Sequence, residues 1–261
     1  MGHERIGILP KTKRWDKVVG QISTFSSENN NVARIAQDTL KNVRGRFEGI
    51  EHDSGVQAAF QFLVFLSHSS KQDKPQDFFS SQGITLSENL SPIQVAKAIN
   101  DWVSKNSESN EYASVAQGAA IDTISEWYQK NKINQAVLFP TENESQEIWR
   151  KTGDGSGFCE LSRLYFSKFT ERYLKYFLER AASAKSNSIS DRNLFGKELE
   201  KHIKDISNHA FETAKITQSF AAGWFNKYAI NDVPTKNKIQ KFLAFAFGKM
   251  RAELLREENR D

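Results

Sequence analysis

The chain of 261 residues contains 36 Lys and Arg against 32 Asp and Glu, one Cys, and 19 Phe, 6 Tyr and 5 Trp. A single cysteine excludes an internal disulfide and a cysteine-rich zinc site, and this many aromatic residues argue against disorder. No run approaches the roughly 18 apolar residues of a membrane span, and the first residues lack the apolar stretch of a secretory signal. We therefore expect a cytoplasmic protein without membrane contact.

The charge is unevenly distributed along the chain. Residues 1–50 have a net charge of +4, residues 51–150 of −6 and residues 151–261 of +6, which gives the total of +4. An acidic middle thus separates two basic ends. Segments of opposite charge can pair with one another within the protein, or each can bind a partner of opposite charge. The simplest alternative is that the charged side chains of all three segments are exposed to solvent.

The first half shows mainly helical periodicity. Residues 54–66 are apolar nearly all round, which is typical of a buried central helix, with a strand over Phe60–Leu66 as the competing interpretation. Ser54 with Gln57 forms a capping-box pattern, and Ser91 followed by Pro92 predicts another helix start. Residues 68–90 are rich in polar residues and predict a long surface loop. Helices are expected near residues 16–25, 30–47, 54–66, 92–103 and 111–130.

The second half is helical as well. An aromatic ridge recurs every four residues over an expected helix at 158–182, a long helix is expected from Asp191 to about Tyr228, and a last amphipathic helix from Thr235. The long helix shows a heptad-like seam that runs from Leu199 to Trp224. The ridge consists of Leu161, Tyr165, Phe169, Tyr173 and Phe177.

These patterns predict a mainly α protein, an irregular bundle of seven or eight helices. A minor two-stranded β element is also expected, in which Ile6–Leu9 pairs with Ala136–Pro140. Residues 1–150 are expected to form an N-terminal helical half with an extended basic arm, and residues 158–261 a C-terminal half. The glycine-rich residues 151–157 would connect the two halves, which can also form one domain.

No known catalytic motif is present: the chain lacks a Walker loop, a Rossmann glycine fingerprint, His-Glu-x-x-His and Gly-x-Ser-x-Gly. Gly153–Gly157 precede a helix, where backbone N–H groups attract phosphate, but they lack the Lys-Ser/Thr of a nucleotide loop, so a flexible connection is favoured. Cys159 lies in the first helical turn, where a thiol can be activated. Its apolar neighbours favour a buried, inert cysteine.

One polar column on the long helix has the spacing of a metal site. Its members recur at steps of four and three residues, so they share a helix face, and carboxylates with histidines bind Zn²⁺ or Fe²⁺. The column consists of Glu198, His202, Asp205, His209 and Glu212. Such sites need further ligands from other helices, typically as Glu-x-x-His pairs, and no such pair is present. A solvated polar stripe is therefore favoured, and we expect no metal or cofactor, with His202, Asp205 and His209 as the only metal candidates.

Basic residues interleave with aromatic ones in three segments: the arm, the 158–182 helix and the last helix. Such faces can contact nucleic-acid phosphates or a protein partner, although amphipathic helices also present them to water. The candidate contact residues are Arg5, Lys11, Lys13, Arg14, Arg163, Lys168, Arg172, Lys175, Lys236, Lys238 and Lys241.

Two segments resemble a known group of proteins. The opening residues Gly2–Trp15 and the segment Phe158–Arg163 are similar to small helical proteins encoded beside ATPases or nucleases in bacterial multi-gene defence operons. The resemblance covers a small part of the chain and transfers no functional residue. It implies a subunit role.

The sequence therefore predicts a non-catalytic helical accessory or scaffold subunit of a cytosolic bacterial complex, which docks an ATPase or nuclease partner in phage or plasmid defence. The first alternative is a nucleic-acid-binding protein that uses its basic arm and C-terminal half. The second is an enzyme with an unrecognised helical site around His202, Asp205 and His209.

Overall fold

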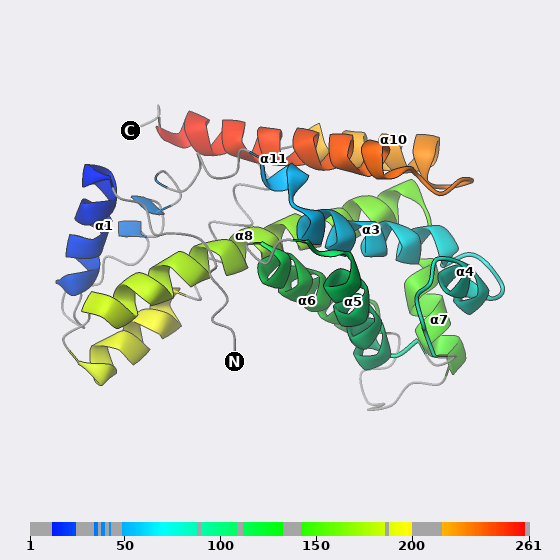
Figure 1. Ribbon diagram of the computed structural model, residues 1–261, viewed down its shortest axis with the longest axis horizontal. Helices are drawn as coiled ribbons and strands as arrows, with labels where there is room; N and C mark the ends of the chain where they lie inside the picture. Colours follow the sequence, from blue (N-terminus) through cyan, green and yellow to red (C-terminus); the bar gives the residue numbers. More distant parts are fainter. Residues whose placement is uncertain are drawn as a thin grey trace.

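The computed structural model describes residues 12–24, 34–35, 38–39, 42, 49–87, 90–108, 112–132, 142–185, 188–199 and 216–258. Ten helices can be delimited among them, and these residues include no strand (Figure 1). The helices are α1 (Lys13–Ser23), the 3₁₀ helix η2 (Ile50–His52), α3 (Ser54–Ser69), α4 (Pro75–Ser81), α5 (Pro92–Asn106), α6 (Ala113–Asn131), α7 (Glu142–Arg150), α8 (Gly155–Lys185), α10 (Ile216–Tyr228) and α11 (Lys236–Glu258).

The mainly α prediction is confirmed, but the predicted count of seven or eight helices is wrong. Two short helices account for most of the difference. α4 lies in the segment expected to be a loop, and it is held by Pro75 in its first turn and the fully buried Phe79. α7 buries Ile148 and Trp149 in its last turn, both about 1% exposed. Helices of this length have too few turns to show a clear period in sequence.

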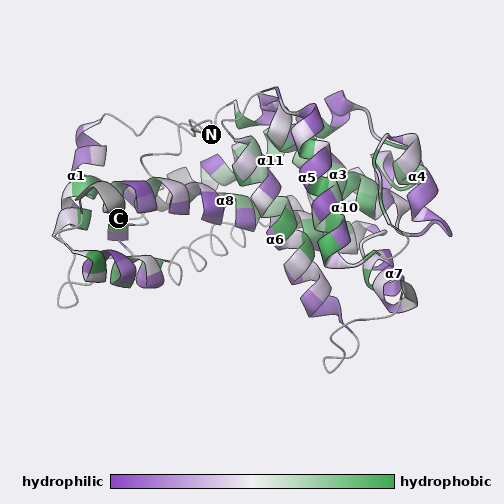
Figure 2. Ribbon diagram, turned by 60° about the horizontal axis from the view of Figure 1, so that its bottom comes forward, coloured by the Kyte–Doolittle hydropathy of each residue, from purple (hydrophilic) through white to green (hydrophobic). Residues whose placement is uncertain are grey.

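α3 is the central helix, as its apolar residues predict. Twelve of its sixteen residues are buried, and it packs against α5, α6, α8 and α11. Hydrophobic residues gather where these helices meet (Figure 2). The helix begins one residue earlier than its capping pattern indicated, because Asp53 is the cap: its Oδ1 accepts hydrogen bonds from the N–H groups of Gly55 and Val56 at 2.9 and 3.0 Å.

α8 is the longest of the helices delimited among the described residues, with 31 residues, and it packs against α6, α10 and α1. The predicted aromatic ridge on this helix is confirmed, since all five of its members are at most 1% exposed. The phenol ring of Tyr173 and the ring of Phe177 lie 4.9 Å apart, and Trp15 of α1 packs edge-on against Phe177. The ridge therefore extends the core from the central bundle to α1.

Two helices near the C-terminus complete the core. α10 packs on α8, whereas α11 lies over η2 and α3 (Figure 1). Phe158 stacks on Phe225 of α10 with ring centroids 4.6 Å apart, and it also contacts Phe60 of α3 and Phe242 of α11. One aromatic side chain thus joins four helices.

The glycine-rich segment is a tight joint between α7 and α8. Thr152 and Gly153 are buried, and α8 already begins at Gly155. A Cβ atom added at Gly157 would come within 2.8 Å of the carbonyl carbon of Lys151, so only glycine allows this approach. Residues on both sides of the joint belong to one connected hydrophobic cluster. The division into two halves stays a prediction.

Several expected elements lie wholly or partly outside the described residues. These are the helix at 30–47, the middle of the long helix from Asp191, and both strands of the expected β element at 6–9 and 136–140. The expected β element therefore stays a prediction. Among the helices that are described, none is long and apolar enough to cross a membrane.

Candidate interaction surface

Charged residues of α6 and α8 form a paired cluster that we call the α6–α8 ionic seam. The guanidinium of Arg172 donates from Nε and Nη2 to the two carboxylate oxygens of Asp122, at 2.6 and 2.9 Å. Lys168 Nζ lies 2.8 Å from Glu126 Oε2 and 3.6 Å from Glu171 Oε2. Acidic residues of the segment 51–150 and basic residues of the segment 151–261 thus pair with one another here.

The seam shifts the pKa of both of its basic groups. The hydrogen bond to Asp122 raises the pKa of Arg172, and burial opposes it to a smaller extent. Burial acts to lower the pKa of Lys168, but its hydrogen bond to Glu126 and the surrounding carboxylates outweigh that effect and raise it. Both side chains are therefore positively charged at neutral pH, and each is compensated within the protein.

A groove of about 470 Å³ runs beside the seam. Its charged lining contains three carboxylates and two basic groups, and Lys175 Nζ lies 3.8 Å from Glu179 Oε1. Three predicted contact residues, Lys168, Arg172 and Lys175, thus have acidic neighbours. A polyanion approaching them would meet the carboxylates as well, which disfavours this face as a phosphate-binding surface.

A second group of basic residues has no such compensation. We call it the α10–α11 basic turn and define it by Lys227, Lys236, Lys238 and Lys241. All four lysines are exposed, and among the described residues no carboxylate lies within ion-pair distance of any of them. Asp232 is the one acidic residue between positions 227 and 241. The turn therefore presents a net positive charge to its surroundings.

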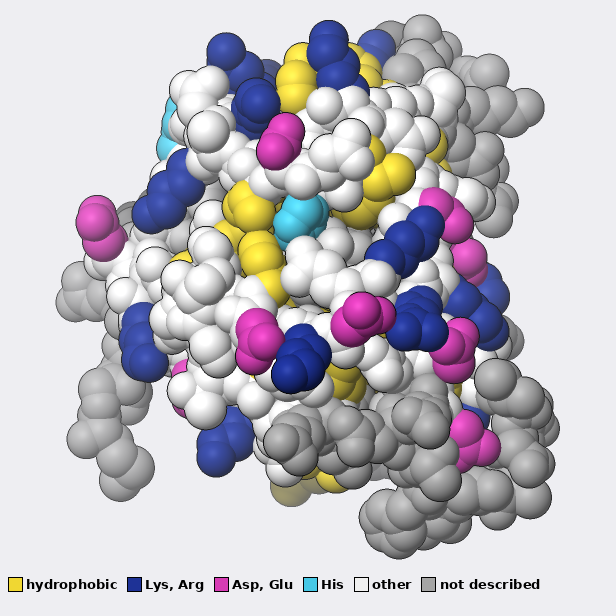
Figure 3. All heavy atoms as spheres, turned by 90° about the vertical axis from the view of Figure 1, so that its right-hand side faces the viewer, with side chains coloured by type: hydrophobic (Ala, Val, Ile, Leu, Met, Phe, Trp, Pro, Cys, Tyr) yellow, Lys and Arg dark blue, Asp and Glu magenta, His cyan; other side chains and the backbone are white. Residues whose placement is uncertain are grey.

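Apolar side chains accompany these lysines. Ile230 and Val233 are each 38% exposed in the loop between the two helices. The Nζ atoms of Lys227 and Lys238 lie 5.1 and 4.7 Å from the centre of the Tyr228 ring, within range of a cation–π interaction. Figure 3 views this end of the molecule, where Lys and Arg side chains surround exposed apolar ones and some acidic side chains are also visible.

The turn is held to the core by defined hydrogen bonds. The N–H groups of Ala229 and Ile230 donate to the carbonyl of Phe225, and His68 Nδ1 lies 2.7 Å from the carbonyl oxygen of Ala229. At the start of α11, Thr235 Oγ1 accepts from the N–H of Lys238 at 3.4 Å. Backbone contacts of this kind fix the positions of the lysines relative to α3.

The other predicted basic residues lie elsewhere or outside the described residues. Lys13 and Arg14 are exposed in the first turn of α1, at the opposite end of the molecule from the α10–α11 basic turn (Figure 1). Arg163 is half-buried on α8. Arg5 and Lys11 lie outside the described residues. The structure thus brings Lys236, Lys238 and Lys241 together and separates them from Lys13 and Arg14.

The metal candidates His202, Asp205 and His209 also lie outside the described residues. Within the part of the chain that is described, no three His, Cys, Asp or Glu side chains gather as a metal site would require. Cys159 is 7% exposed, and burial raises the pKa of its thiol. The prediction of a buried cysteine is confirmed.

Comparisons with known proteins give no match: no family model, no curated protein and no solved structure is significantly similar to this chain.

The sequence analysis missed three members of the surface around the α10–α11 basic turn, namely Lys227, Ile230 and Val233. Lys227 could have been found by counting charges over residues 227–241, which contain four lysines and one acidic residue. The exposure of Ile230 and Val233 leaves no such signal, because an apolar residue in a loop is equally compatible with burial.

Proposed function

We propose that this protein is a non-catalytic helical accessory subunit of a cytosolic multi-protein complex, and that it docks an acidic face of a larger partner through the α10–α11 basic turn. The observation behind the proposal is the set of four exposed lysines without a carboxylate partner among the described residues, beside Ile230 and Val233. Protein interfaces combine an apolar centre with charged groups around it, and opposite charge on the partner speeds and orients association.

The attachment of the turn to the core supports this proposal. The bonds from Ala229 and Ile230 to Phe225, and from His68 to Ala229, hold the loop before any partner binds. A surface that is ordered in the free protein loses less conformational entropy on binding. A partner can therefore gain affinity from a small set of contacts.

The class of partner follows from the sequence resemblance. Proteins similar in the opening residues and in the segment Phe158–Arg163 are encoded beside ATPases or nucleases in bacterial defence operons. An ATPase or nuclease with an acidic surface is accordingly the proposed partner, and defence against phage or plasmids the proposed setting.

Charge reversal at two lysines tests the proposal. Lys236→Glu with Lys238→Glu should lose the co-purifying partner and weaken its affinity by at least about tenfold, which is about 1.4 kcal/mol. Glutamate in the first turn of a helix interacts favourably with the helix dipole, so α11 should remain folded. The matched control is Lys97→Glu with Lys105→Glu on α5, where both lysines are also exposed. Equal partner recovery by the two double variants would contradict the proposal.

Nucleic acid is the second candidate ligand of the same turn. Lys236 and Lys238 lie in the first turn of α11, where the helix dipole is already positive, and this combination suits phosphate groups. Binding to a labelled duplex should then decrease with salt, and the slope of log K against log salt should become shallower by about 0.9 for each lysine that stops contacting phosphate. No binding at low salt would exclude this candidate.

A further inference from the structure

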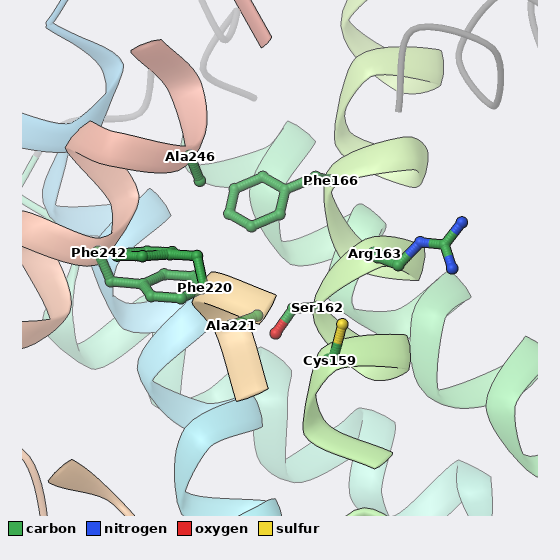
Figure 4. A pocket seen from close by; sticks show the side chains of 8 residues that line it. All are labelled: Cys159, Ser162, Arg163, Phe166, Phe220, Ala221, Phe242 and Ala246. Carbon is green, nitrogen blue, oxygen red and sulfur yellow. The ribbon is translucent and has the colours of Figure 1, made fainter. Parts of the chain in front are cut away.

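Two hollows in the described part of the chain differ greatly in size. The pocket between α8, α10 and α11, which Figure 4 shows beside Ser162 and Cys159, has about 10 Å³ of free space, so it holds at most one water. The groove beside the α6–α8 ionic seam has about 470 Å³, which is within the range of small-molecule sites in proteins. The groove, unlike the pocket, is therefore large enough for a small ligand.

The two helices that line the groove run antiparallel. Successive residues of α6 pair with successively earlier residues of α8, as three ion pairs show: Asp122 with Arg172, Glu126 with Lys168, and Lys130 with Glu160. The start of α6, where Val115 lies, therefore faces the Glu179 end of the groove, and the position of Asp122 faces the Glu171 end.

The charges of α8 alternate along the groove. Glu171, Lys175 and Glu179 recur every four residues, so they share one face of the helix. The two glutamates are eight residues apart, which corresponds to about 12 Å along the helix axis. Arg172 lies between them, paired with Asp122. The lining thus has a carboxylate at each end and basic groups between them, and its three carboxylates and two basic groups give a formal charge of −1.

The carboxylates at the two ends can still accept hydrogen bonds. Lys168 Nζ is 3.6 Å from Glu171 Oε2, because its closer contact, at 2.8 Å, is with Glu126. Lys175 Nζ is 3.8 Å from Glu179 Oε1. Both separations exceed the length of a hydrogen bond. Among the described residues, neither Glu171 nor Glu179 accepts a hydrogen bond.

The Arg172 guanidinium has further donors as well. A guanidinium has five N–H groups, and Arg172 uses Nε and Nη2 to donate to the two carboxylate oxygens of Asp122. Its remaining N–H groups have no partner among the described residues. A carboxylate bound in the groove can accept hydrogen bonds from them.

Ligands of a single charge suit this lining poorly. An anion attracted to Arg172 would also meet carboxylates, and a cation attracted to Glu171 would also meet basic groups. A ligand with both charges gains from each kind of group. The order of charges along α8 calls for a carboxylate near the middle of the groove and a cationic group towards each end.

We propose that the α6–α8 groove binds a basic α-amino acid, such as lysine or arginine. The ligand carboxylate bonds Arg172, the α-ammonium group bonds Glu171, and the side-chain cation reaches Glu179. The methylene groups between them lie along Val115 and the Tyr176 ring, as the stems of long cationic side chains do on apolar surfaces. The net charge of +1 on the ligand complements the lining. The site shares no residue with the α10–α11 basic turn, so it is independent of the proposed docking function.

Analogues of lysine test the three contacts separately. Cadaverine lacks the carboxylate, norleucine lacks the side-chain amine, and 6-aminohexanoate lacks the α-amine. Their binding to the full-length protein is measured by ligand-observed NMR beside that of L-lysine and L-arginine. Relative to L-lysine, 6-aminohexanoate should bind at least about tenfold more weakly, because the Glu171 side chain is only 19% exposed. Cadaverine and norleucine should bind about two- to fivefold more weakly, since Arg172 and Glu179 are 41% and 52% exposed.

Two results of this series would overturn the proposal. One is that neither L-lysine nor L-arginine binds at low ionic strength. The other is that L-lysine and its three analogues bind equally well, because the groove would then recognise none of the three groups.

Variants assign each contact. Glu171→Gln should weaken L-lysine binding by at least about tenfold and leave 6-aminohexanoate unchanged, because that compound has no α-ammonium group. Glu179→Gln should weaken L-lysine binding by about two- to fivefold and leave norleucine unchanged. Glu160→Gln is the matched control, since this carboxylate of α8 pairs with Lys130 outside the groove.

Urea unfolding shows whether each variant is folded. A folded Glu171→Gln protein that binds L-lysine as tightly as the original, or no more weakly than the Glu160→Gln protein, would refute the proposed contact. If Glu171→Gln fails to fold, Glu179→Gln decides, because its side chain is more exposed. An equal loss of L-lysine and norleucine affinity in that variant would also refute the proposal.

Discussion

Arg172 of α8 lies directly against Gly118 of α6. A Cβ atom added at Gly118 would come within 2.6 Å of the Arg172 guanidinium carbon. The same guanidinium is held by two hydrogen bonds to Asp122, one helical turn further along α6. A glycine in the middle of a helix costs about 1 kcal/mol relative to alanine. Here the missing side chain of Gly118 leaves space for the Arg172 guanidinium to reach Asp122.

The first prediction concerns the strength of this pair. In a double-mutant cycle with Arg172→Ala and Asp122→Ala, we expect a coupling energy of about 0.5–1 kcal/mol. Each side chain is more than a third exposed, so solvent screening reduces what a bidentate pair can contribute. Urea unfolding of the four proteins measures the coupling.

Lys130 and Glu160 provide the comparison for this cycle. They also pair between α6 and α8, but their side chains are 60% and 40% exposed. Their coupling should be smaller, near the lower end of the range for surface pairs. If Lys130 and Glu160 show the same coupling energy as Arg172 and Asp122, the close approach of Arg172 to Gly118 does not strengthen its ion pair.

Gly118→Ala is the second prediction. The alanine should stabilise α6 by about 1 kcal/mol through helix propensity, while displacing the guanidinium and weakening its bonds to Asp122. The two effects are similar in size, so the free energy of unfolding should change by less than about 1 kcal/mol. The informative measurement is the Arg172–Asp122 cycle repeated in this background, where the coupling should vanish. A coupling that persists would show that the pair does not depend on the glycine.

The arrangement of α8 could be predicted because its signal is local. Leu161 and the four aromatic residues that follow it at steps of four, up to Phe177, are all buried in the structure. The same holds for α3, whose apolar run is nearly continuous. The capping residue of α3 was predicted one residue late, since both Asp53 and Ser54 can cap a helix and only the backbone decides which one does.

Contacts between distant residues could not be predicted. Arg172 and Asp122 are 50 residues apart, and nothing in either segment identifies the other as its partner. Three basic residues of α8 have carboxylate partners, whereas Lys236, Lys238 and Lys241 of α11 have none among the described residues. The two segments look alike in sequence, so this difference could not be predicted. Ser162 likewise becomes a buried hydroxyl without a hydrogen-bond partner among the described residues only after α8 has packed against its neighbouring helices.

The third prediction concerns the aromatic junction at Phe158. Phe158→Ala should lower the free energy of unfolding by about 3–5 kcal/mol, because a fully buried ring in contact with α3, α10 and α11 leaves a cavity that cannot close. Phe78→Ala is the matched control. Its ring is only partly buried beside Phe65 and His68. Equal losses in urea unfolding would show that Phe158 has no special role as a junction.

The fourth prediction concerns Tyr165, whose side chain is fully buried and whose hydroxyl has no partner among the described residues. Burial, and to a smaller extent the charge of Asp53, raise the pKa of this hydroxyl. In the unfolded chain the Tyr165 hydroxyl ionises near pH 10, whereas in the folded protein it stays protonated at that pH. The free energy of unfolding should therefore decrease as the pH rises above about 10. Tyr165→Phe should remove this part of the decrease.

At neutral pH the Tyr165→Phe protein should be as stable as the original or more stable by up to about 1–3 kcal/mol, because the unpaired hydroxyl is gone and the ring remains. Urea unfolding at about pH 7 and about pH 11 measures both effects. Tyr176→Phe is the control, since its hydroxyl accepts a hydrogen bond from Arg180 at 2.9 Å at the surface. A Tyr165→Phe protein that is less stable at neutral pH would show that the hydroxyl has a stabilising partner in the folded protein.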